Sequence, residues 1–81
     1  MKAKQEELHR VFADRVLIQA GKQNMLLSEI GRRAGFSRST MHQYVSNGRH
    51  LPRLDKLAAI AQVLHVSTDY LCGLTDEEGS R

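Results

Sequence analysis

Residues 28–48 read SEIGRRAGFSRSTMHQYVSNG, and this stretch decides the fold. Two runs with apolar residues at helical spacing lie on either side of a short turn. In the turn, Gly35 can take the positive φ at which helices end, and the Ser37 hydroxyl can accept a hydrogen bond from a backbone N–H at the start of the next helix. Gly31 lies where the two helices would approach each other closely, so a residue without a side chain fits there. The stretch therefore predicts two short helices joined by a tight turn.

The second of these helices, expected at 38–46, has an apolar and a polar face. Met41, Tyr44 and Val45 follow helical spacing and would hold it against the first helix, expected at about 26–34. Two short helices joined by a glycine-containing turn are the layout of a DNA-binding helix-turn-helix. The outer face of the second helix carries only hydrogen-bonding residues, none of them acidic: Arg38, Ser39, His42, Gln43 and Ser46.

Three side chains of this outer face suit the recognition of DNA bases. Arg38 can donate two hydrogen bonds to a guanine edge, Gln43 can pair with an adenine edge, and Ser39 can bond to several bases. The N-terminal turn of the second helix is the part that enters the major groove. Arg38 and Ser39 are therefore better placed than Ser46.

The distribution of charge points to an anionic partner for the same part of the chain. Residues 22–56 contain seven basic and two acidic residues, a net charge of +5, whereas residues 1–21 carry +1 and residues 57–81 carry −3. A basic block indicates nucleic acid only where its residues share one face. The basic block at 22–56 meets this condition on the outer face of the helix expected at 38–46.

Helical spacing continues toward the N-terminus. Leu17 and Ile18 are expected to broaden an apolar stripe, and Gly21 is expected to end this first helix. The residues that recur every four positions along the stripe are Leu8, Phe12, Val16 and Ala20.

Two further helices are expected toward the C-terminus. Pro52 would open the fourth helix, where its missing N–H costs nothing, and Ser67 would cap a short fifth helix that buries Tyr70 and Leu71. The stripe of the fourth helix consists of Leu54, Leu57, Ala58, Ala61 and Leu64. No segment alternates with period two, so the predicted fold is all-α, a compact bundle of about five short helices.

Length and composition bound the organisation of the molecule. The chain has 81 residues and a net charge of +3, which leaves room for one domain, placed at 1–75, followed by a flexible acidic tail at 76–81. A single cysteine excludes an internal disulfide and favours a reducing compartment. No apolar run approaches the roughly 20 residues of a membrane-spanning helix. We expect a cytoplasmic protein with no membrane partner.

No group of residues suggests catalysis or metal binding. The four histidines include no pair spaced four apart and no pair of cysteines accompanies them, so a zinc site is not expected. Cys72 is a lone thiol without a placed base. We expect no enzymatic activity, no metal and no cofactor.

The segment from about Phe12 to Leu74 resembles the lambda-repressor and Cro-like helix-turn-helix family, also called XRE-type regulators. The ordered set of matching elements carries the resemblance, since no one of them is specific. The set comprises Phe12 and Val16, Gly35 to Met41, Asn47-Gly48-Arg49 with Pro52, the stripe from Leu54 to Leu64, and Val66 to Leu71.

The resemblance implies sequence-specific binding to double-stranded operator DNA as a homodimer, usually to regulate transcription. From it we expect a repressor of prokaryotic or phage type. One departure stands out: the family often has a glutamine opening the second helix, where it grips a phosphate, and this chain has Leu27. Backbone N–H groups at that helix terminus can still bind phosphate. Carried over onto this sequence, the base-reading positions are Arg38, Ser39, His42 and Gln43, and the phosphate-contacting positions are Leu27, Ser28, Ser46, Asn47, Arg49 and Arg53.

Two alternatives keep the fold and change the function. In the first, the protein is an antitoxin whose main partner is a toxin protein, and the acidic residues Asp76, Glu77 and Glu78 belong to the partner segment. In the second, the 81 residues are the N-terminal DNA-binding part of a longer repressor. For a homodimer, the apolar candidates for the contact between copies are Leu51, Leu71, Cys72 and Leu74.

Overall fold

The computed structural model of the chain describes residues 2–47 and 51–79. The described residues form five helices and no strand, which confirms the all-α fold. The helices are α1 (Lys2–Gln23), α2 (Leu27–Ala34), α3 (Arg38–Ser46), α4 (Leu54–Leu64) and α5 (Thr68–Cys72).

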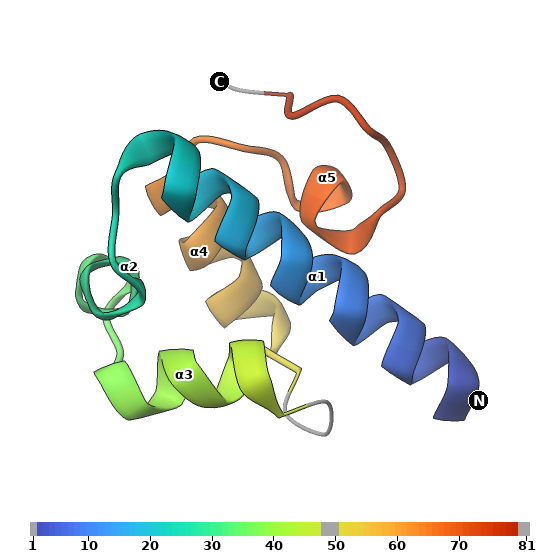
Figure 1. The fold of residues 1–81 in the computed structure, drawn as a ribbon, viewed down its shortest axis with the longest axis horizontal. Coiled ribbons are helices and arrows are strands. Elements are labelled where there is room, and N and C mark those ends of the chain that lie inside the picture. Colours follow the sequence, from blue (N-terminus) through green and yellow to red (C-terminus); the bar gives the residue numbers. More distant parts are fainter. Residues whose placement is uncertain (1, 48–50, 80–81) are drawn as a thin grey trace.

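Helix α1 crosses the molecule as a central diagonal, with α2 and α3 on one side of it and α5 on the other (Figure 1). Helix α2 packs against α3 and α4, while α1 contacts α3, α4 and α5. The core lies where these helices meet and takes side chains from each of the five. Its fully or almost fully buried members include Phe12, Val16, Ile30, Met41, Ile60, Leu64, Tyr70 and Leu71.

The structure corrects two predictions about α1. The helix does not end at Gly21 but continues to Gln23, and Asn24 takes the left-handed conformation with φ 56°. Leu17 and Ile18 do not broaden the buried stripe, because they are 47% and 52% exposed. Phe12, Val16 and Ala20 are buried as expected, whereas Leu8, at 38%, lies at the exposed margin of the stripe.

The start and the buried face of α4 also differ from the prediction. Pro52 lies before the helix, which has Arg53 as its N-cap residue and begins at Leu54. Leu54 and Ala58 are exposed, so the predicted stripe was wrong at these two positions. The buried face instead includes Ile60, which is not part of the predicted stripe. The remaining predicted members of the stripe are buried or partly buried: Leu57, Ala61 and Leu64.

The C-terminal segment, residues 74–79, runs along α1 near α5 (Figure 1). Arg15 donates hydrogen bonds to the carbonyls of Tyr70 and Thr75 and binds the Asp76 carboxylate at 2.8 Å. Two residues further along the chain, Glu78 accepts a hydrogen bond from the Ser67 backbone N–H through its own carbonyl, at 2.7 Å. The segment is thereby bonded to α1 and to the N-terminus of α5. None of the helices in the described ranges is both long and apolar enough to cross a membrane.

Candidate nucleic-acid interface

The turn between α2 and α3 has the chemistry that the sequence predicts. Gly35 takes φ 93°, and the N–H of Phe36 bonds to the carbonyl of Gly31 at 2.9 Å, which closes the end of α2. The Ser37 hydroxyl accepts a hydrogen bond from the N–H of Thr40 at 3.1 Å and caps α3. Both signals act within a few residues, so the start of α3 is set locally.

Gly31 is the point of closest approach between α2 and α3. A Cβ atom at this position would lie 3.1 Å from the Cβ of Met41 and 3.2 Å from the carbonyl oxygen of Ser37. These distances are shorter than ordinary van der Waals contacts. The glycine therefore allows the backbone of α2 to lie directly against the first turns of α3.

The inner face of α3 is held by apolar contacts. Met41 is fully buried, and the ring of Tyr44 meets the ring of Phe36 edge to face, with centroids 5.6 Å apart and an interplanar angle of 75°. The ammonium of Lys56 on α4 lies 5.4 Å from the centroid of the Phe36 ring, within the range of a cation–π contact. The Phe36 ring of the turn thus lies between Tyr44 of α3 and Lys56 of α4, and α3 itself packs against α2 and α1.

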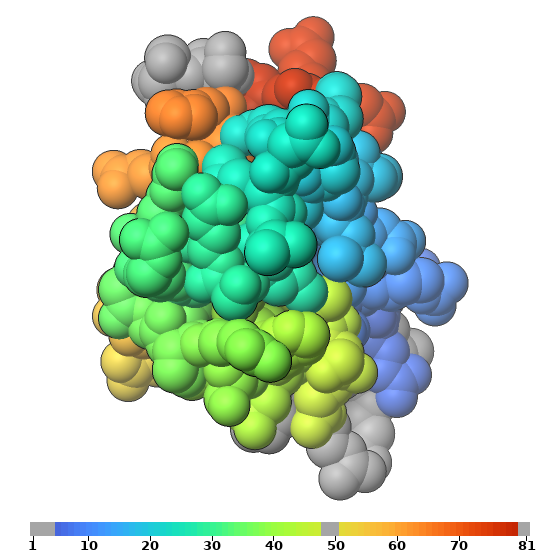
Figure 2. Space-filling view, turned by 60° about the vertical axis from the view of Figure 1, so that its left-hand side comes forward, coloured from blue at the N-terminus to red at the C-terminus, as the bar shows by residue number. Residues whose placement is uncertain are grey.

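The opposite face of α3 is exposed, and α2 and α3 lie side by side over much of one surface of the molecule (Figure 2). The exposed positions follow helical spacing in adjacent pairs, one pair on each turn, so they form one continuous stripe. The stripe carries hydrogen-bonding groups and no acid. It consists of Arg38, Ser39, His42, Gln43 and Ser46, followed by Asn47 at the C-cap.

Arg38 differs from Arg33 and Arg53 of the basic block, each of which has an acidic partner. Arg33 forms an ion pair with Glu29 at 3.0 Å, and Arg53 lies 3.7 Å from the carboxylate of Asp55. Within residues 2–47 and 51–79, Arg38 has no ion pair. Its guanidinium is therefore available to an external acceptor.

Ser46 has its hydroxyl proton engaged. The hydroxyl donates to the carbonyl of His42, one turn back in α3, at 2.7 Å. A phosphate oxygen can only accept a hydrogen bond, so Ser46 offers it a donor only after giving up this internal bond. In its present geometry the side chain is an acceptor.

The first turn of α2 lies beside the first turns of α3. Leu26, the N-cap residue of α2, makes no side-chain cap, so the first backbone N–H groups of the helix are left for an external acceptor. Two open hollows adjoin this terminus, and Arg38 lines both. His42 and Ser28 line one hollow. Arg32 and Ser28 line the other together with Glu29, whose carboxylate is paired with Arg33. These groups could together receive an anion at the junction of the two helices.

The remaining predicted phosphate contacts lie after α3. Asn47 is exposed, and its N–H bonds to the carbonyl of Gln43 at 2.9 Å. Arg53 is exposed at the start of α4. Arg49 lies outside the described residues.

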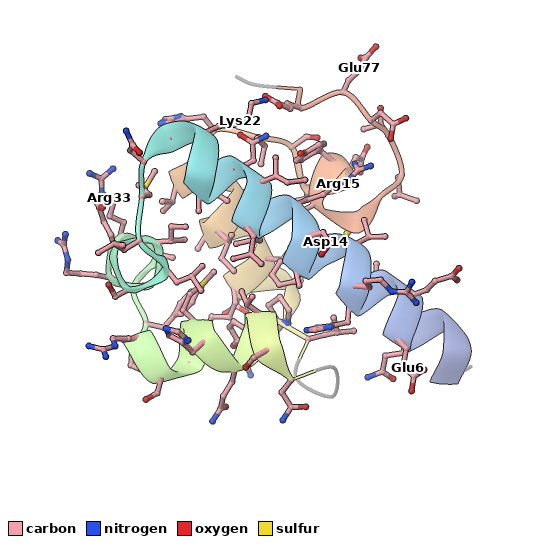
Figure 3. All side chains as sticks on the ribbon, in the orientation of Figure 1. Glu6, Asp14, Arg15, Lys22, Arg33 and Glu77 are labelled. Atoms are coloured by element: carbon pink, nitrogen blue, oxygen red, sulfur yellow. The ribbon has the colours of Figure 1, made fainter. Side chains whose placement is uncertain are left out.

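Arg32 is not among the predicted site residues, although it lines a hollow together with Arg38. A signal was present: Arg32 follows Ser28 by four residues, so both lie on one face of α2. Exposed arginines on short helices are common, and spacing alone gave no reason to choose Arg32 over Arg33. Figure 3 shows Arg33 extending from α2 away from α3.

A family model described as "Helix-turn-helix" matches residues 18–71, which is more than half of the chain. The match includes all of α2, α3 and α4, and therefore the whole exposed stripe of α3. Comparisons with curated proteins and with solved structures found no match. With its five helices, its capped turn and its family match, the chain belongs to the lambda-repressor-like (XRE-type) helix-turn-helix family of DNA-binding regulators.

Proposed function

We propose that the protein is a sequence-specific regulator that reads an operator in double-stranded DNA by placing α3 in the major groove. The observation that carries this proposal is the exposed stripe of α3, which is polar, free of acids and held in place by a fully buried Met41 on the opposite face. A rigid helix with such a face fits the width of the major groove.

Within the stripe, we assign base reading to Arg38, Ser39, His42 and Gln43. Arg38 and Ser39 occupy the first turn of α3, which reaches deepest into the groove. A guanidinium suits the two acceptors of guanine, and the amide of Gln43 suits the acceptor and donor of adenine.

We assign phosphate contacts to groups at the two ends of the helix-turn-helix. At the first end, the uncapped N-terminus of α2 supplies the backbone N–H groups of Leu27 and Ser28. At the second end, Asn47, Arg49 and Arg53 follow α3. The internal bond of Ser46 favours a role as an acceptor near base edges over the phosphate contact that the resemblance implies.

We further propose that two copies bind a pseudo-palindromic operator, with their α3 helices in successive major grooves about 34 Å apart. Occupying such a site in the cytoplasm of a prokaryote, or of a cell that carries a phage, would repress transcription by excluding polymerase. Of the apolar candidates for the dimer contact, Leu71 is fully buried and therefore cannot touch a second copy, whereas Leu74 is 77% exposed. Leu51 and Cys72 are partly exposed and stay candidates.

The regulator is favoured over the antitoxin by the C-terminal segment. Asp76 binds Arg15, and the Glu78 carboxylate binds Lys22 and Gln19, so both acids are engaged within the chain. A toxin would have to displace these contacts to bind the segment.

Selection of duplexes from a random pool tests the proposal. We expect the purified chain to enrich an inverted repeat, and a duplex with two half-sites to bind more tightly than a duplex with one. Enrichment of no sequence over the starting pool would contradict the proposal, and enrichment of a single half-site would contradict the dimer alone.

A further inference from the structure

A hydrogen bond from α1 reaches the far end of the DNA-facing helix. Nε2 of His9 lies 2.8 Å from the carbonyl oxygen of Tyr44, across 35 residues of sequence. A carbonyl oxygen only accepts, so the imidazole is the donor and Nε2 carries a proton.

The acceptor is one of the carbonyls at the C-terminus of α3. The last four carbonyls of a helix have no partner within the helix. The carbonyl of Gln43 receives the N–H of Asn47, and the next carbonyl, that of Tyr44, receives His9. A donor at this terminus also meets the negative end of the helix dipole.

His9 belongs to a part of α1 that contacts the region around the end of α3. The neighbouring residues Leu8 and Phe12 line a hollow of about 40 Å³ together with Leu51 and Pro52, which lie between α3 and α4. Residue 9 precedes the family match, which begins at residue 18. The contact is therefore added to the helix-turn-helix from outside the matched residues.

We propose that His9 is a positioning residue for DNA recognition, an inference that rests on the proposed function. The N-terminal end of α3 is fixed by the Ser37 cap and by the contact between Gly31 and Met41. His9 fixes the other end. A tilt of about 10° around the Ser37 end would displace Gln43 by more than about 1 Å, which is outside the tolerance of a directional contact.

The positioning role predicts a loss of specificity rather than a loss of folding. Phosphate groups attract the protein to any duplex and carry no sequence information, whereas base contacts depend on the angle of α3. Loss of the His9 bond should therefore weaken binding to the selected operator and leave binding to unrelated duplexes unchanged.

The test compares His9→Gln with His9→Met, two side chains of similar length and shape of which only glutamine can donate a hydrogen bond. We expect His9→Gln to retain the operator affinity of the wild type. We expect His9→Met to bind the operator about three- to tenfold more weakly, the effect of losing one hydrogen bond, with unchanged affinity for a scrambled duplex at low salt. Circular dichroism identifies a temperature at which both variants are folded, and the binding is measured at that temperature.

The outcomes separate this inference from the proposed function. Equal ratios of operator to scrambled affinity in the two variants would overturn the positioning role. So would parallel losses on both duplexes that follow the folded fraction, because they would assign His9 to stability alone. Arg38→Ala in the same assay tests the function itself: if the wild type and Arg38→Ala both fail to discriminate between the duplexes, the proposed function fails whatever His9 does.

Discussion

At the scale of single residues, arginines of the basic block differ in what their charges already bind. Arg33 is paired with Glu29 and extends away from α3 (Figure 3), whereas Arg38 is exposed and has no ion pair within the described residues. Exposed ion pairs contribute little to stability but lower the charge that a site offers to DNA. For DNA binding, the position of a charge and the partner it already has therefore matter more than the net charge of +3.

Replacing Arg38 by alanine should weaken operator binding by about 1–3 kcal/mol and remove discrimination at one base pair, because a bidentate contact to a base edge is lost. Titrations of the operator and of its single-base variants measure this effect. Arg33→Ala is the matched control and should preserve the order of preference among these variants. Equal weakening on all sequences would instead identify Arg38 as a phosphate contact.

Arg53→Ala should act on every duplex alike, because a phosphate contact carries no sequence information. We expect the slope of log K against log salt to fall in magnitude by about one. The carboxylate of Asp55 lies 3.7 Å from Arg53, so Asp55→Asn in the wild-type background should strengthen binding slightly. An unchanged slope in Arg53→Ala would remove this residue from the interface.

At the scale of elements, the helix-turn-helix is a unit because α2 and α3 touch at backbone distance. Gly31→Val would add three carbon atoms where even a single Cβ would lie 3.1 Å from the Cβ of Met41 and 3.2 Å from the Ser37 carbonyl oxygen. Overpacking of this kind costs about 1–3 kcal/mol, so we expect the free energy of unfolding to fall by that amount in denaturant titrations. Unchanged stability would show that the two helices can separate without cost.

Gly21 provides the control for this prediction. It also lies inside a helix, but nothing is found within 4 Å of a Cβ added there. Gly21→Ala should raise the free energy of unfolding by about 0.5–1 kcal/mol through helix propensity alone. A fall in stability would mean that residue 21 is not in an ordinary helical environment.

At the scale of the whole molecule, polar contacts bind the C-terminal segment to α1. Lys22 donates to the Glu78 carboxylate at 2.6 Å and Gln19 donates to it at 2.8 Å; both donors come from α1, and Lys22 is labelled in Figure 3. The ammonium of Lys22, together with the Gln19 amide, holds the pKa of the Glu78 carboxyl below its usual range. The same contact raises the pKa of Lys22.

These pKa shifts predict how stability depends on pH. Folding lowers the pKa of the Glu78 carboxyl. Its contribution to the free energy of unfolding is therefore complete above the unfolded pKa of about 4.3, and it disappears as the pH falls through the lower pKa of the folded state. Glu78→Gln should therefore be less stable than the wild type at pH 7, and the difference should shrink on acidification. Thermal unfolding of the wild type and of Glu78→Gln between about pH 2 and 7 measures how the stability of each depends on pH.

Glu77→Gln is the control for this prediction. Its side chain is exposed and points away from the helices (Figure 3), so its thermal unfolding should follow the wild type across the same range of pH. A difference between wild type and Glu78→Gln that stays constant down to about pH 2 would contradict the role assigned to the Glu78 carboxylate.

The sequence by itself determined the helix-turn-helix. Gly35 and Ser37 act on backbone groups a few residues away, so the end of α2 and the start of α3 follow from local chemistry. The exposed stripe of α3 follows from helical periodicity once Met41 is assigned to the inside.

Only the tertiary structure decided which apolar side chains are buried and which distant residues meet. Leu17 and Leu54 satisfy a helical stripe yet are exposed, while Gln19 is 2% exposed because Tyr70 and Glu78 supply partners for its amide. The hydrogen bond from His9 to the Tyr44 carbonyl likewise joins residues that lie far apart in the sequence. The periodicity of a sequence shows which residues share one face of a helix. Which faces are buried, and which distant residues form hydrogen bonds, depends on how the neighbouring helices pack against one another.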